Sequence, residues 1–347
     1  MAITEKPFGN TAAGNAVKLY TITNKNGASV SIITYGGIIQ SLNVPDKTGK
    51  LVDVSLGCDN IEDYERQGAS LGALIGRVSG RLQNSEITLE GVTYKLCAND
   101  GKNHLHGGKV GFSKRVWGSK INGETLELSL LSPDGEENYP GNLQVTVVYS
   151  FSDNNELLID YTAVTDKDTP VKLTNHCYFN LSGEASGTIL DDTLMLNCDT
   201  VCESNEELIE TGKVVPVAGT PLDFKTPHAF GERINDSYPL LKSAGGYDHY
   251  FLLNRTDNSL MPAAELYSKK TGILMLTRTT AAGVQLYTGN FMDNLPAKGG
   301  RNYNKREGVC LETQSYPNFM YCKNFPSIVL HKGETYHEAT VFQFLVK

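Results

Sequence analysis

The sequence predicts an all-β protein in which one large antiparallel domain spans residues 1–347 and helices are few and short. Runs in which apolar and polar residues alternate recur along the chain, and residues that favour turns separate them. The few helix candidates do not alternate regularly with the strand candidates, which argues against a βαβ architecture. The 34 glycines suit a chain with many turns better than one with long helices.

The clearest strand signals lie at 126–130 and 143–151. In the first run, leucines at every second position alternate with Glu127 and Ser129. In the second run, apolar residues at every second position from Leu143 to Phe151 do the same. A period of two is expected where one face of a strand packs on a core. Similar short runs predict strands at 17–23, 28–34, 86–96, 157–164, 273–279, 284–288 and 339–346.

Turn residues and helix signals fill the spaces between these runs. Pairs such as Asn26-Gly27 and Glu90-Gly91 favour tight turns. A short helix is expected at 60–66, where acidic residues come early and Arg66 comes late, in accord with the helix dipole. A single helical turn is expected to begin at 204–207 and to end by Gly212.

Composition and charge exclude several classes of function. The formal net charge is −8 and no dense run of lysine and arginine is present, so we expect no nucleic-acid partner. No stretch approaches the roughly 18 to 20 consecutive apolar residues that a membrane span needs, and no secretory signal is visible at the start. The seven cysteines are scattered and odd in number, which predicts reduced thiols and a cytoplasmic protein.

The common cofactor motifs are absent from the sequence. It contains no G-x-G-x-x-G after a strand, no phosphate-binding glycine loop and no H-E-x-x-H. Cys198 and Cys202 have no second Cys or His pair close in sequence, so two ordinary thiols are expected there rather than a zinc site. We therefore expect neither a metal nor an organic cofactor.

Four polar segments place ionisable groups where a strand would carry simpler residues. The first, 103–108, sets His104 and His106 beside two glycines, which indicates a tight backbone with imidazoles free to face a ligand. A surface loop histidine is the alternative. The second, 174–180, would place His176 and Tyr178 on one strand face, either as a ligand-binding wall or as a solvated face.

The other two segments each carry a carboxylate. In 246–251, Asp248 lies among three aromatic residues, which suits carbohydrate recognition but also fits an aromatic cluster in which Asp248 binds backbone amides. In 308–314, Glu312 falls in the middle of an expected strand. A carboxylate there is costly to bury unless it is paired or functional, although an exposed strand glutamate remains an alternative.

With these segments in view, the chain resembles the galactose mutarotase family, also called aldose 1-epimerases, from about Gly9 to the carboxy terminus. No single matching motif is decisive, but seven of them in the family's order are specific. They are GALIGRVSGRL at 72–82, LHGG at 105–108, SPDGEENYPG at 132–141, LTNHCYFNLSG at 173–183, GYDHYFLL at 246–253, GVQLYTGNF at 283–291 and GVCLETQ at 308–314.

The resemblance implies a β-sandwich with an open cleft that needs neither metal nor organic cofactor. It implies that Glu312 is the catalytic base, that His176 is the catalytic acid and that His106 is the second histidine of the cleft. The sugar-contacting positions that it implies are Arg81, Tyr178, Asp248 and Gln285. One departure stands out: many relatives carry Asn before the arginine, where this chain has Gly80, and this removes one possible hydroxyl contact.

The implied reaction interconverts the α and β anomers of an aldose, such as galactose or glucose, by opening and reclosing the ring. Ring opening needs a base for the C1 hydroxyl proton and an acid for the ring oxygen, which suits a carboxylate such as Glu312 and an imidazolium such as His176. The expected binding partner is the small-molecule aldose substrate. We expect the protein to be a monomer, with a homodimer as the alternative.

Three other functions remain possible from the sequence. A hexose-6-phosphate 1-epimerase is disfavoured because Gly108 and Lys109 stand where such relatives place an arginine for phosphate. A non-catalytic sugar-binding protein would be expected to lack the acid or the base, yet both His176 and Glu312 are present. A glycosidase would use Asp248 and Glu312 as its two carboxylates but would leave the histidines without a role.

Overall fold

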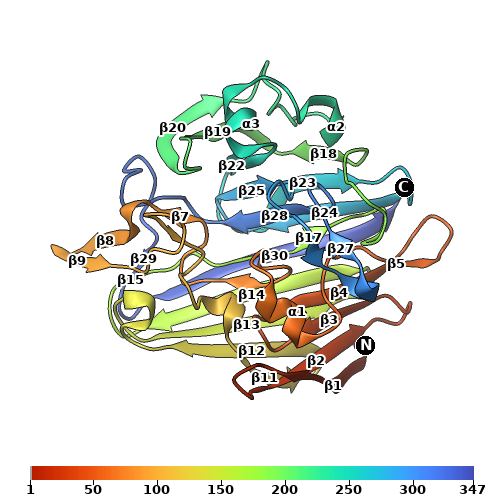
Figure 1. Cartoon of the computed structure of the whole chain (residues 1–347), viewed down its shortest axis with the longest axis horizontal. Helices are drawn as coiled ribbons and strands as arrows, with labels where there is room; N and C mark the ends of the chain where they lie inside the picture. The colour runs from red at the N-terminus through yellow and green to blue at the C-terminus, as the bar shows by residue number, and fades with distance from the viewer. Residues whose placement is uncertain (1) are drawn as a thin grey trace.

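The computed structural model describes residues 2–347, and antiparallel strands are its dominant secondary structure (Figure 1). The longest strands belong to a nine-stranded sheet that joins the middle of the chain to its carboxy-terminal strand. In order across the sheet, its strands are β11 (Gly118–Asn122), β12 (Thr125–Ser132), β13 (Leu143–Phe151), β14 (Glu156–Thr165), β30 (Thr335–Val346), β24 (Ile273–Thr279), β23 (Met261–Tyr267), β18 (Thr193–Leu196) and β21 (His228–Ala229).

Two further sheets accompany it. A six-stranded sheet consists of β17 (Tyr178–Phe179), β28 (Val309–Gln314), β25 (Gly283–Tyr287), β22 (Asp248–Leu253), β19 (Cys198–Ser204) and β20 (Glu210–Pro216). A five-stranded sheet at the amino terminus consists of β1 (Ala2–Asn10), β2 (Ala16–Thr23), β3 (Ser29–Ile33), β4 (Ile39–Pro45) and β5 (Leu51–Asp53).

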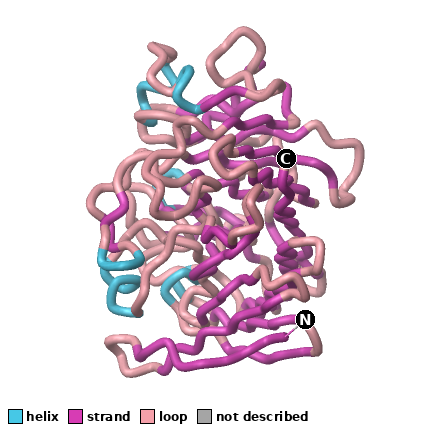
Figure 2. Tube along the Cα trace, turned by 90° about the vertical axis from the view of Figure 1, so that its right-hand side faces the viewer, coloured by secondary structure: helices cyan, strands magenta, loops and turns pink. Residues whose placement is uncertain are grey.

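Short strand pairs and helices complete the structure. The pairs are β6 (Leu74–Ile75) with β16 (Thr174–Asn175), β7 (Arg81–Leu82) with β10 (His104–Leu105), β8 (Glu86–Leu89) with β9 (Val92–Lys95), β15 (Thr169–Pro170) with β29 (Val329–Leu330), and β26 (Leu295–Pro296) with β27 (Asn302–Tyr303). The α-helices are α1 (Ile61–Arg66), α2 (Phe230–Arg233) and α3 (Pro239–Ala244). Figure 2 shows these helices as short segments at the periphery of the strands.

The main core of the β-sandwich is formed by buried side chains of the nine-stranded, six-stranded and five-stranded sheets. The apolar positions that alternate along β13 are all fully buried, as their period of two predicts: Leu143, Val145, Val147, Tyr149 and Phe151. Across the core, the ring of Phe179 in β17 lies 5.0 Å from that of Phe342 in β30, centroid to centroid. The predicted all-β class and the alternating strands are therefore confirmed.

The local predictions had mixed outcomes. The helix at 60–66 is confirmed as α1, and the Asn60 side chain caps it by accepting a hydrogen bond from the backbone N–H of Asp63. The run at 86–96 is a hairpin, β8 and β9, that turns at Glu90-Gly91 as expected. The helical turn predicted at 204–207 is wrong, because these residues belong to the end of β19 and to the loop that leads into β20. The Asn205 side chain accepts hydrogen bonds from the backbone N–H groups of Glu207 and Ile209 and so stabilises that loop.

All seven cysteines are free thiols, and six of them are buried. None of the helices in residues 2–347 is long and apolar enough to cross a lipid bilayer.

Candidate active site

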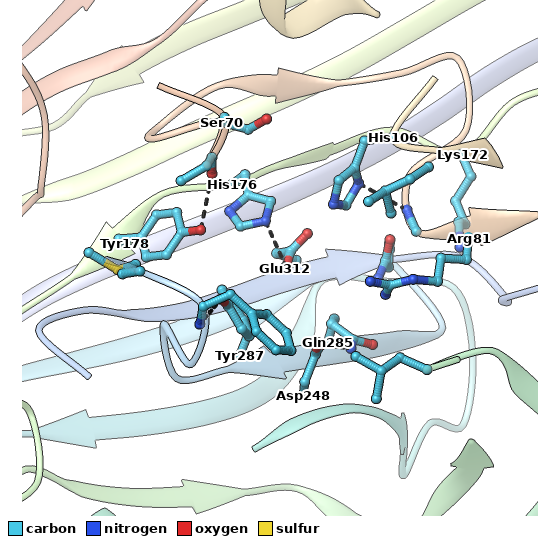
Figure 3. Close-up of a pocket in the computed structure, with 18 of the residues that line it drawn as sticks. Ser70, Arg81, His106, Lys172, His176, Tyr178, Asp248, Gln285, Tyr287 and Glu312 are labelled. Carbon is cyan, nitrogen blue, oxygen red and sulfur yellow. Dashed lines mark hydrogen bonds and ion pairs between the residues drawn. The ribbon is translucent and has the colours of Figure 1, made fainter. Parts of the chain in front are cut away.

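A cavity of about 350 Å³ opens beside the six-stranded sheet, within the usual size range of small-molecule sites. Figure 3 shows side chains from distant parts of the chain converging on it. All seven residues that the resemblance marked are among the polar residues that line it: Arg81, His106, Lys172, His176, Tyr178, Glu210, Asp248, Gln285, Glu312 and Gln314. The fold thus brings all the expected site residues to one pocket.

Strands β22, β25 and β28 form one wall of the cavity. Gln285 in β25 pairs directly with Glu312 in β28, and Asp248 in β22 pairs with Tyr287 in β25. Because directly paired residues on neighbouring strands point to the same face, these side chains project together into the cavity. The antiparallel register therefore fixes the spacing of the two carboxylates.

The two faces of β28 have different surroundings. Val309 and Leu311 pack in the core, whereas Glu312 and Gln314 line the cavity. This agrees with the strand expected over 308–314. Glu312 is only 3 % exposed, which excludes the alternative of an exposed strand glutamate.

His176 lies opposite Glu312, on a segment that is less regular than the sequence suggested. The continuous strand expected over 174–180 is interrupted at His176, between β16 and β17. Its backbone is held instead by the 72–73 segment, since His176 N donates to the Ala73 carbonyl (2.8 Å) and its own carbonyl accepts from Gly72 N (3.0 Å). The residue is buried, so the solvated face considered from the sequence is wrong.

The imidazole of His176 is close to Glu312 and is packed on three sides. Its Nε2 lies 3.6 Å from Glu312 Oε1, and its Nδ1 lies 3.4 Å from Cys310 Sγ. The Tyr178 ring stacks on it at 5.0 Å between centroids and an interplanar angle of 29°. The Tyr178 hydroxyl donates to the Ala69 carbonyl (3.0 Å), so this side chain orients His176 and is itself fixed.

Burial acts on both members of this pair and favours their neutral forms. It raises the pKa of Glu312 to about 8, helped by the nearby Asp248 charge and opposed by Lys172 and Arg81. It lowers the pKa of His176 to about 4. The sequence suggested an ionised glutamate facing an imidazolium, whereas the structure favours a single proton on the pair that resides mainly on Glu312.

His106 completes the group of imidazoles, and its backbone is constrained. It has φ +52°, and the adjacent Gly107 has φ +81° in a position where a Cβ would overlap the Gly76 carbonyl. The paired glycines thus serve the tight backbone that the sequence predicted. His104, two residues earlier, points elsewhere: its ring is fully buried and bonds to the Cys97 carbonyl and the Tyr139 hydroxyl.

The hydrogen bonds of His106 fix which ring nitrogen carries its proton. Its Nδ1 accepts a hydrogen bond from the backbone N–H of Gly80 (3.1 Å), which leaves Nε2–H as a donor. Burial and the neighbouring His176 hold the pKa of His106 well below its usual range, so the ring is neutral at physiological pH. The surface-loop alternative for His106 is excluded because the ring lines the cavity.

Two side-chain pairs set the polarity of the rest of the cavity. Arg81 Nε donates to Asp100 Oδ2 (2.7 Å), which anchors the guanidinium while its other nitrogens remain available. Asp248 Oδ1 accepts from Gln285 Nε2 (2.6 Å). Because burial also raises the pKa of Asp248, this hydrogen bond and the Arg81 charge are what favour its ionised form.

Several lining residues were not predicted, although alternation could have indicated two of them. Gln314 lies two positions after Glu312 and so shares its strand face. Lys172 lies four positions before His176, which would also place the two on one face of a strand. Tyr287 and the exposed Phe291 stack on each other at the rim, at 6.1 Å between centroids. Glu210 is the first residue of β20, and no pattern in the sequence indicated that it would line the cavity.

The cavity offers hydrogen-bond donors and acceptors around one buried carboxyl–imidazole pair, which is an arrangement for moving protons to and from a polar ligand. Among residues 2–347, no cluster of three or more His, Cys, Asp or Glu side chains is arranged to hold a metal ion. Cys198 and Cys202 lie in or beside the core, in β19.

Comparison with known proteins gives a consistent result. A family described as "Aldose 1-epimerase" matches residues 18–343. The galactose mutarotase of Sus scrofa is 38% identical over 347 residues, covering 100% of this chain and 99% of that protein. The aldose 1-epimerase of Escherichia coli K12 is 34% identical over 339 residues, covering 96% and 97%. The crystal structure of galactose 1-epimerase from Lactobacillus acidophilus superposes with a TM-score of 0.86 at 27% identity and covers 99% of both chains.

Proposed function

Because the chain belongs to the aldose 1-epimerase family and is an aldose mutarotase, we propose that Glu312 and His176 carry out the two proton transfers of its reaction. The observation that supports these roles most directly is the distance of 3.6 Å between His176 Nε2 and Glu312 Oε1 in a buried cavity. A C1 hydroxyl and a ring oxygen are bonded to the same carbon of a pyranose. One acid and one base this close together can therefore serve both oxygens.

Ring opening then proceeds as a concerted exchange. Glu312 takes the proton from the C1 hydroxyl, the C1–O5 bond breaks with its electrons moving to O5, and His176 Nε2–H gives its proton to O5. The products are an open-chain aldehyde, a protonated Glu312 and a neutral His176. After rotation about C1–C2, the reverse transfers close the ring on the opposite face, so no net proton is consumed.

The pKa shifts of the pair support this sequence. Burial favours the form with the proton on Glu312 and none on His176. That form is the one the enzyme adopts while the sugar is open. Burial of the pair therefore lowers the free energy of the enzyme form that accompanies the aldehyde, while a hydrogen bond from the C1 hydroxyl to Glu312 favours the ionised carboxylate when the closed sugar is bound.

The remaining residues hold the sugar while C1 turns. We assign hydroxyl binding to Arg81, Asp248 and Gln285, and a hydrogen bond from the neutral His106 Nε2–H to a sugar oxygen. Tyr178 is assigned a positioning role, because its hydroxyl is engaged by Ala69 and its ring stacks on His176. The reaction needs no metal or organic cofactor on this scheme.

We propose D-galactose and D-glucose as substrates, since the relatives named above are called galactose mutarotase, galactose 1-epimerase and aldose 1-epimerase. Polarimetry of freshly dissolved α-D-galactose and α-D-glucose should show faster decay of optical rotation with the enzyme than with buffer alone. Glucose 6-phosphate serves as the comparison. A rate enhancement confined to the phosphorylated sugar would assign the protein to the hexose-6-phosphate branch instead.

The pH dependence of kcat/KM is expected to report the single proton of the pair. The pair gains a second proton below the His176 pKa of about 4 and loses its only proton above the Glu312 pKa of about 8. Activity should therefore be nearly constant between these values and should fall on both sides. Stopped-flow polarimetry, with the hydroxide-catalysed background subtracted at each pH, measures this profile. A rise in kcat/KM through pH 8 would mean that a shared proton is not required.

Replacing Asp248 with alanine is expected to raise KM by on the order of tenfold to a hundredfold, as loss of a charged hydrogen-bond partner does, with a smaller effect on kcat. The same substitution removes a like charge that raises the pKa of Glu312. The upper limit of the pH profile should therefore move to lower pH. An unchanged KM would remove Asp248 from substrate binding, and the Asp248→Asn variant separates the loss of charge from the loss of shape.

We also propose that the whole chain acts as one domain, as a monomer and in the cytoplasm. Pairing of β14 with β30, from the middle and the end of the chain, supports a single domain. Seven free thiols suit a reducing compartment. Size-exclusion chromatography with light scattering distinguishes a monomer from a homodimer.

A further inference from the structure

Lys172 is a buried lysine in the wall of the active-site cavity to which the proposed proton transfers give no role. It is 1 % exposed, yet it is one of the residues that line the cavity. Its backbone N donates to the Arg77 carbonyl (2.9 Å), and its carbonyl accepts from Ser79 N (2.9 Å). The ammonium is therefore carried on a fixed stretch of backbone that runs beside the segment leading to Arg81.

In the part of the chain that the structure describes, the ammonium of Lys172 has no protein partner of its own. Within residues 2–347 no hydrogen bond or ion pair joins its Nζ to an acceptor. The carboxylates of Glu210, Glu312 and Glu338 act on it only from longer range, and burial lowers its pKa. A buried ammonium without an acceptor is costly, so an acceptor supplied by the occupant of the cavity would stabilise it.

Gly80 leaves room for this acceptor. The residue has φ +69°, and a Cβ built there would lie 3.4 Å from Lys172 Nζ with no other atom within 4 Å. The space next to the ammonium is therefore open.

The place of Lys172 in the cavity indicates which part of the sugar it meets. In Figure 3, Lys172 lies beside Arg81, on the side of Glu312 away from Tyr178. If C1 and the ring oxygen lie at Glu312 and His176, the atoms across a pyranose ring from them are C4 and C3. The edge of the ring that carries the C3 and C4 hydroxyls then faces the cationic end of the cavity.

We propose that Lys172 is a substrate-binding residue whose ammonium donates a hydrogen bond to a hydroxyl oxygen on the C3–C4 edge of the aldose, and so supplies a donor that Gly80 cannot. The inference rests on the proposed function, because that function places C1 at Glu312 and His176. It adds a contact that would affect sugar specificity, made by a side chain that is not among the sugar-contacting residues expected from the sequence.

The test compares Lys172→Met with the native enzyme on sugars that do and do not carry the hydroxyls. For D-galactose and D-glucose, kcat/KM should fall by on the order of tenfold to a hundredfold, mainly through KM. For 3-deoxy-D-galactose or 4-deoxy-D-xylo-hexose, the ratio of native to variant kcat/KM should approach one for the sugar that lacks the contacted hydroxyl. Lys109→Met, which removes an exposed lysine charge outside the cavity, should leave all ratios near one.

An equal loss on every sugar would overturn the proposal, because it would show that Lys172 acts through the charge of Glu312 and not through a hydroxyl. No loss on galactose and glucose would overturn it as well. If the methionine variant does not fold, Lys172→Gln allows the same comparison with a polar side chain. Failure here would leave the role of Glu312 intact, since that role is judged by kcat in Glu312→Gln and not by the deoxy sugars.

Discussion

Replacing Glu312 with glutamine is expected to lower kcat by about 10²- to 10⁴-fold, the usual contribution of a positioned acid or base. Glutamine keeps the size of the side chain and can still accept a hydrogen bond from the C1 hydroxyl, but it cannot take up the proton. Affinity for the sugar should therefore change little. Polarimetry measures the rate, and saturation-transfer NMR with D-galactose measures binding independently of turnover.

Glu338→Gln is the matched control for this substitution. Burial raises the pKa of Glu338 to about 7, as it does for Glu312, but its carboxylate accepts a hydrogen bond from Tyr336 and it does not line the active-site cavity. This variant should keep its activity. A Glu312→Gln enzyme with near-native rates would remove Glu312 from the mechanism.

The thermal stability of Glu312→Gln provides a check on folding. The folded-state pKa of Glu312 lies above its usual value, so the native protein loses stability as the pH rises toward about 8 and Glu312 must ionise while buried. Glutamine removes this cost. The variant should match or exceed the native melting temperature at alkaline pH, which would show that its low activity does not come from unfolding.

The strands were predictable from sequence because their apolar residues alternate with the period that a half-buried sheet requires. β13 shows this most clearly, since every second residue from Leu143 to Phe151 is fully buried. The interruption at His176 was not predictable in this way. It depends on hydrogen bonds to Gly72 and Ala73, about a hundred positions earlier, and no local pattern encodes such a contact.

Motifs in the sequence also combine structural and functional residues that only the structure separates. In GALIGRVSGRL, Arg81 lines the cavity, whereas the guanidinium of Arg77 is buried and donates to the carbonyls of Ser132, Pro133, Pro140 and Gly141. The SPDGEENYPG segment therefore binds the Arg77 side chain through its backbone carbonyls, and none of its residues is among those that line the cavity. Likewise His106 faces the cavity, while His104 packs against Tyr139.

The pKa shifts of Glu312 and His176 could not be predicted from the sequence. An ionised Glu312 and a protonated His176 are natural expectations for the isolated side chains near neutral pH. Burial reverses the order of their pKa values because both charged forms lose water in the cavity. The degree of burial depends on how Tyr178, Cys310 and the sheet pack around the pair, which is a property of the folded chain.

Replacing His176 with asparagine is expected to lower kcat as severely as the change at Glu312, by about 10²- to 10⁴-fold, because the ring oxygen loses its proton donor. Asparagine keeps the backbone hydrogen bonds to the 72–73 segment. His104→Asn is a useful comparison, since that histidine is also buried and its loss should lower the melting temperature with a much smaller effect on the kcat of the folded enzyme.

The residual activity of His176→Asn should also depend on pH in the opposite sense from that of the native enzyme. Without the imidazole no proton is shared, and Glu312 acts as a base only when it is ionised. The residual kcat/KM should therefore rise as the pH increases through the Glu312 pKa of about 8, where the native activity falls. A profile that keeps the native shape would place the shared proton on another group, and His106 would then be the nearest imidazole to examine, with its ring 5.4 Å from that of His176.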